Sequence, residues 1–83
     1  MLPSQAIGYL KNVPEDEPVF VLRAKDKYAP ATITSWAAMV SQQVDKNTPA
    51  TPKSLKKAHE AMQLVKDIRE WQERRDDQVK IPD

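Results

Sequence analysis

Apolar residues recur at helical spacing in two long stretches of the chain. The first stretch begins near Pro30 and the second at Pro52, and in both the apolar positions return every three or four residues, as on one face of a helix. In the first stretch they are Ile33, Trp36 or Ala37, Val40 and Val44, and in the second they are Leu55, Ala58, Met62, Leu64 or Val65, Ile68 and Trp71. The spacing predicts helices over 30–44 and 52–77.

The residues at the ends of the two stretches support these helices. Pro30 and Pro52 suit a first helical turn, where the missing N–H would have no helical partner in any case. Thr51 stands directly before Pro52 and provides an N-cap side chain. A short connection joins the two stretches, so we expect an antiparallel helical hairpin.

The chain before the hairpin is predicted to be less regular. Residues 4–11 predict a short helix, although Gly8 weakens it. Pro14 and Pro18 bracket an acidic run and indicate a turning linker. Residues 19–24 begin with Val-Phe-Val-Leu, which is β-branched and aromatic and therefore predicts an extended or β segment. The expected fold is mainly α in a single small domain, 1–83.

The predicted β segment has no evident partner within the chain. It can pair with the same segment of a second copy, or lie as an arm along the helices. The second helix, at about 25 residues, is also longer than a first helix of about 15 can cover. Both features favour a homo-oligomer over a monomer with its N-terminal segment folded across the overhang. The residues expected in the core or in a subunit contact are Phe20, Leu22, Ile33, Val40, Met62, Val65, Ile68 and Trp71.

Composition argues against most kinds of chemistry. The chain has no cysteine, one glycine and one histidine, His59, so a thiolate site, a glycine-rich phosphate loop and a His-His metal pair are excluded. We therefore expect no enzyme, no metal and no cofactor. The net charge of +1 disfavours nucleic acid, and the longest apolar run, Val19 to Leu22, is too short to span a membrane.

Aromatic and cationic residues converge where the β segment meets the first long helix. Arg and Lys side chains beside aromatic rings at a helix N-terminus are typical of an anion site. The candidate ligand-binding residues are Arg23, Lys25, Lys27, Tyr28 and Trp36. Val19 to Leu22 would anchor this site against the helices. In the alternative, Arg23 pairs with Asp26 or with the acidic run Glu15 to Glu17 and merely closes the fold.

Several short motifs resemble those of small accessory proteins of tailed bacteriophages and prophages. They are E-P-V-F-V-L-R-A-K-D at residues 17–26, A-P-A at 29–31, S-W-A at 35–37 and K-I-P-D at 80–83. The resemblance implies a cytoplasmic protein of an infected bacterium that serves in counter-defence or host takeover by binding. Two functions remain open: sequestration of an anionic, nucleotide-like small molecule, and inhibition or adaptor binding of a host protein through a helical face. A DNA-binding regulator is a weaker third.

Overall fold

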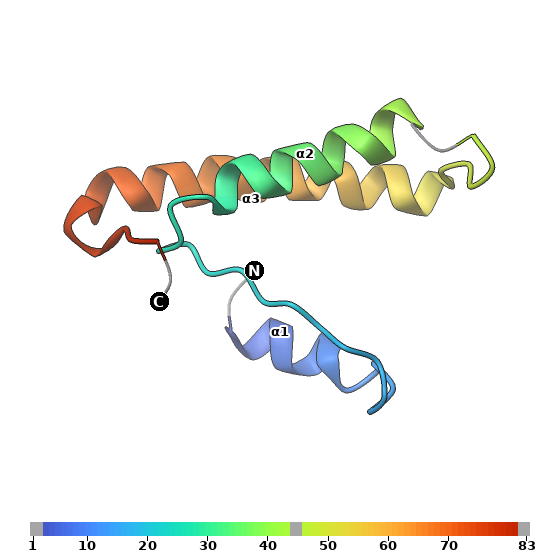
Figure 1. The fold of residues 1–83 in the computed structure, drawn as a ribbon, viewed down its shortest axis with the longest axis horizontal. Helices are drawn as coiled ribbons and strands as arrows, with labels where there is room; N and C mark the ends of the chain where they lie inside the picture. Colours follow the sequence, from blue (N-terminus) through green and yellow to red (C-terminus); the bar gives the residue numbers. More distant parts are fainter. Residues whose placement is uncertain (1–2, 44–45, 82–83) are drawn as a thin grey trace.

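The computed structural model describes residues 3–43 and 46–81 (Figure 1). Its elements are α1 (Pro3–Leu10), α2 (Ala29–Gln42), α3 (Pro52–Arg74) and a short 3-10 helix, η1 (Asp76–Gln78). The prediction that the chain is mainly α-helical is confirmed. Within the described ranges there is no β-sheet, and the one isolated β-bridge joins Asp26 to Lys80 in the parallel sense.

Helix α2 begins with a proline turn and ends at a left-handed residue. Pro30 lies in its first turn, and Tyr28 precedes the helix without a side-chain capping bond. Gln43 adopts φ 50° and ψ 53°, and its N–H bonds back to the carbonyls of Met39 and Val40. This geometry ends the helix at Gln42, whereas the predicted helix reached residue 44, which lies outside the described residues.

Helix α3 begins as the sequence predicts but ends earlier. Thr51 is its N-cap, and its hydroxyl accepts a hydrogen bond of 3.1 Å from the backbone N–H of Ser54. The helix ends at Arg74, three residues before the predicted end at residue 77. Asp76 and Asp77 come next, and carboxylates are unfavourable at the negative end of a helix dipole. They form η1 instead.

Helices α2 and α3 lie side by side and run in opposite directions (Figure 1), and the small core lies at their contact. Most of the core residues are alanines, which allow the helix backbones to approach closely. Among the described residues, the buried hydrophobic side chains are Ala29, Ala37, Ala58, Val65 and Ile68. A core this small stabilises the chain only modestly.

A turn at residues 24–28 ties the start of α2 to the end of α3. The side-chain amide of Gln72 donates hydrogen bonds to the carbonyls of Ala24 and Asp26, at 2.8 and 2.9 Å. The backbone of Lys80 forms hydrogen bonds to the residues on both sides of Asp26. The Lys80 N–H donates to the carbonyl of Lys25 at 2.9 Å, and the Lys27 N–H donates to the carbonyl of Lys80 at 3.0 Å. Three segments distant in sequence are thereby held together.

The segment that links α1 to this turn, residues 11–23, is called here the arm. The arm and α1 extend away from α2 and α3 (Figure 1). The radius of gyration is 14.2 Å, against about 12 Å for a compact chain of this length. The side chain of Tyr9 in α1 meets α3 at Lys57, with the ammonium 3.5 Å from the phenol oxygen and 5.7 Å from the ring centre.

The predicted β segment, 19–24, does not form a strand. Residues 19–23 have no regular secondary structure, and residues 24 and 25 belong to the turn. A strand needs a neighbour to accept and donate its backbone hydrogen bonds. The part of the chain that the structure describes places no such neighbour beside this stretch.

Candidate functional site

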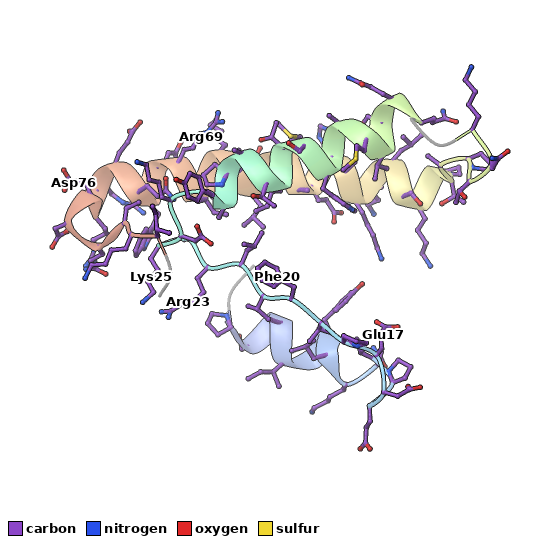
Figure 2. The ribbon with its side chains drawn as sticks, in the orientation of Figure 1. Glu17, Phe20, Arg23, Lys25, Arg69 and Asp76 are labelled. Atoms are coloured by element: carbon purple, nitrogen blue, oxygen red, sulfur yellow. The ribbon has the colours of Figure 1, made fainter. Side chains whose placement is uncertain are left out.

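The cationic residues of the predicted site lie on and beside the turn at residues 24–28. Figure 2 shows Arg23 at the end of the arm nearest the helices, Lys25 just beyond it in the turn, Glu17 further along the arm toward α1, and Phe20 between Glu17 and Arg23. Asp26 holds the turn, because its carboxylate accepts the backbone N–H of Tyr28 at 2.8 Å. Within the described ranges, Arg23 and Lys25 are exposed and their side chains form no salt bridge. The alternative pairing of the Arg23 side chain with Asp26 or with the acidic run is therefore absent from this part of the chain.

Trp36 does not join this cationic group. It lies eight residues after Tyr28 on α2, about 12 Å further along the helix axis. Tyr28 is 52% exposed, and Trp36 lines a different hollow, described below. The structure therefore gathers Arg23, Lys25 and Tyr28 along one short stretch without building an enclosed aromatic and cationic pocket around them.

Lys27 lies at an open groove of about 730 Å³ over the end of α3. The groove is lined by two cations, Lys27 and Arg69, and two carboxylates, Glu73 and Asp76. Gln72 and Val79 complete its lining. Figure 2 labels Arg69 and Asp76 in this region. Because the opposite charges balance, the groove offers no strong attraction to an anion.

A second hollow, mostly apolar, lies where α2, the following loop and the start of α3 meet. Its volume is about 420 Å³, and it is lined by Trp36, Met39, Val40, Gln43, Thr48, Pro49, Ala50 and Ser54. Trp36 is 45% exposed and Met39 is 53% exposed. The sequence signal for this hollow is weak, because Met39 is outside the apolar stripe of α2 and a proline such as Pro49 ordinarily indicates only the end of a helix.

The apolar residues of the arm are also exposed. Val19, Phe20 and Val21 are 56%, 83% and 67% exposed, and Leu22 is half-buried. The expectation that Val19 to Leu22 anchors the site against the helices is therefore wrong for a single chain. The physical reason is that the arm leaves the helices at the turn and leads toward α1 (Figure 1).

The residues predicted for the core or a subunit contact divide into three groups. Val65 and Ile68 are buried between α2 and α3. Leu22, Ile33, Val40 and Trp71 are half-buried. Met62 and Phe20 are 42% and 83% exposed. Exposed members of this set remain available to a second protein.

Groups able to bind a metal are not assembled in the described residues, which contain no cluster of three or more His, Asp or Glu side chains suited to a metal. His59 is exposed on α3. The described residues also include no helix that is long and apolar enough to cross a membrane.

Comparison of the chain with protein-family models, with curated proteins and with solved structures gives no match. The surface of the chain is therefore what indicates its function.

Proposed function

We propose that the protein is a non-enzymatic binding protein that acts as a homo-oligomer by contact with another protein, as an inhibitor or adaptor. The observation that supports this is the amount of exposed surface. The chain exposes 7179 Å², whereas a compact protein of 9.5 kDa exposes about 5,000 Å². The difference, about 2,000 Å², exceeds the roughly 800 Å² that one partner contributes to a standard interface.

The chemistry of the exposed surface favours a protein partner. Trp36 and Met39 border an apolar hollow, and aromatic residues and methionine are enriched at protein interfaces. Apolar side chains that are exposed together mark contact sites on small proteins. Arg23 and Lys25, in contrast, line neither of the two hollows described above.

The resemblance to phage accessory proteins suggests the setting. The proposed partner is a protein of the infected bacterium, bound in its cytoplasm, and the purpose is counter-defence or host takeover. A protein of this kind needs no catalytic group, since it acts by occupying a surface of its target.

Sequestration of an anionic small molecule is the second candidate. One observation favours it: among the described residues, Arg23 and Lys25 have no acidic partner within salt-bridge distance. An anionic ligand would then be held at the exposed turn beside Tyr28, with solvent on one side.

A binding experiment with two variants separates the candidates. The tagged wild type, Trp36→Ala with Met39→Ala, and Arg23→Glu with Lys25→Glu are used to capture proteins from a bacterial lysate, and captured proteins are identified by mass spectrometry. The proposal expects a protein that the wild type retains and that the Trp36 and Met39 variant binds about 30-fold or more weakly, as for an interface anchor. Gln63→Ala, an exposed change on α3, is the control.

The same proteins are tested against a panel of nucleotides by thermal shift. A nucleotide that raises the Tm of the wild type, but not that of the Arg23 and Lys25 variant, would support sequestration. If that result came without any captured protein, the proposed protein contact would be wrong.

A further inference from the structure

The middle of the arm has the properties of a strand without a neighbour. Val19, Phe20 and Val21 are more than half exposed, and two of the three are β-branched. Among the described residues, the backbone N–H and C=O groups of these three residues have no hydrogen-bond partner. An exposed apolar strand edge is a template for pairing with another chain.

We propose that two copies of the protein dimerise by antiparallel pairing of residues 17–23, with Phe20 facing Phe20 across the two-fold axis. This inference depends on the homo-oligomer part of the proposed function and specifies the contact that forms it. Its occupant is a second copy, because the stretch is complementary to itself.

Charge complementarity selects the register. With Phe20 at the two-fold axis, Glu17 faces Arg23 of the second copy, and Val19 faces Val21. Cross-strand pairs of opposite charge stabilise a sheet, and like charges destabilise it. Shifting the register by one residue in either direction would place Glu17 opposite Leu22 or Ala24. Only Asp16 would then face a cation, Arg23 or Lys25, so the shifted registers have fewer pairs of opposite charge.

The residues just outside 17–23 extend the same pattern. Glu15 and Lys25 lie at equal distances from Phe20 along the sequence, so opposite charges also meet beyond the paired stretch. Figure 2 shows the acidic end at Glu17 and the basic end at Arg23 and Lys25, with Phe20 between them. The order of the segment, with an acidic end, an apolar middle and a basic end, therefore matches an antiparallel contact between identical chains.

Pro18 also fits this register. In an antiparallel pair, hydrogen-bonded and non-hydrogen-bonded positions alternate along the strand. If Phe20 occupies a non-hydrogen-bonded position, then so does Pro18, which has no N–H to donate. Val19 and Val21 then occupy hydrogen-bonded positions, and the two Val19–Val21 pairs exchange four backbone hydrogen bonds.

The available surface is sufficient for such a dimer. A two-stranded ribbon alone is marginal in water, so the contact must bury further surface from α1 or the helices. Each copy has about 2,000 Å² of surface beyond that of a compact chain, which is within the range that obligate dimers bury per subunit.

A charge exchange tests the contact. Glu17→Arg and Arg23→Glu are purified separately, and their masses are measured by light scattering at a concentration where the wild type is dimeric. Each variant alone brings two pairs of like charges together, and we expect its dimer Kd to rise at least about 10-fold. In an equal mixture both pairs become complementary again, so we expect the dimer, of about twice 9.5 kDa, to return.

Controls make the result specific. Glu60→Arg carries the same charge change as Glu17→Arg at an exposed position of α3 and should leave the dimer intact. Circular dichroism should show unchanged helix content in both arm variants, since the arm is not part of α2 or α3. The chain has no cysteine, so Phe20→Cys can also be tested for a disulfide between copies, because facing non-hydrogen-bonded residues are close enough for one. Ser35→Cys, on α2, is the exposed control.

The outcomes separate this inference from the proposal on which it depends. If the mixture dimerises no better than either variant alone, the proposed register is wrong. In that case a dimeric wild type would still support the homo-oligomer proposal. A wild type that stays at 9.5 kDa up to hundreds of micromolar overturns both. Restored dimer in the mixture, with cross-linking at Phe20→Cys well above that at Ser35→Cys, supports the paired arm.

Discussion

Replacing Gln72 by Ala should detach the turn at residues 24–28 from α3. The Gln72 amide is half-buried and donates two hydrogen bonds, to Ala24 and Asp26, across more than 40 residues of sequence. Both hydrogens of the amide are used, because one nitrogen carries two donors.

The cost follows from these contacts. A hydrogen bond contributes about 0.5–1.5 kcal/mol to stability, so two contribute about 1–3 kcal/mol. Water can reach the released carbonyls at this partly exposed position, which reduces the expected loss to about 1–2 kcal/mol. For a chain of this size, that lowers the Tm by about 5–15 °C.

The assay is thermal unfolding followed by circular dichroism, with all proteins at one concentration because self-association would shift the Tm. Gln63→Ala is the matched control. It makes the same substitution at an exposed site of α3, where the amide forms one long hydrogen bond of 3.5 Å to Asp67. The change in helix propensity is the same at both sites. Equal Tm values for Gln72→Ala and Gln63→Ala would refute the proposed role of Gln72.

Two further predictions concern the ends of the long helices. Thr51→Ala removes the hydroxyl that accepts the N–H of Ser54 and should lower the free energy of unfolding by about 1 kcal/mol in urea titrations; Thr51→Ser should retain most of it, and equal losses in both would contradict the capping role. Gln43→Gly should raise stability by about 0.5–1 kcal/mol, because Gln43 has a φ of 50° that glycine adopts without strain; a lower urea midpoint would contradict this.

The helices were predictable because their signals are local. Apolar spacing, the Thr51 N-cap and the prolines in both first turns all act within a few residues, so they can be recognised in the sequence. The early end of α3 is not evident from the sequence, because Asp76 and Asp77 also fit a charged helix face that continues. Their effect depends on where the helix dipole ends, and on the return of the chain to form the bridge at Lys80.

The arrangement of the candidate site was less predictable because it depends on distant contacts. Gln72 looks like an ordinary polar residue of a helix face, and only the folded chain brings the carbonyls of Ala24 and Asp26 to it. The apolar hollow beside Trp36 likewise requires the loop before α3 to fold back on α2. The basic stretch at Arg23 and Lys25 was recognised from sequence, but its separation from Trp36 follows from the length of α2.

The most direct test of the account is the exchange of backbone amide hydrogens in the arm of the wild type, followed by NMR at high and low protein concentration. In a single chain, the N–H groups of Val19 and Val21 have no partner among the described residues. We expect both N–H groups to be protected at least about 10-fold at high concentration and dilution to remove this protection. The intervening N–H of Phe20 should exchange freely at both concentrations. If the N–H groups of Val19 and Val21 exchanged at unprotected rates at every concentration, the pairing of the arm with that of a second copy would be contradicted.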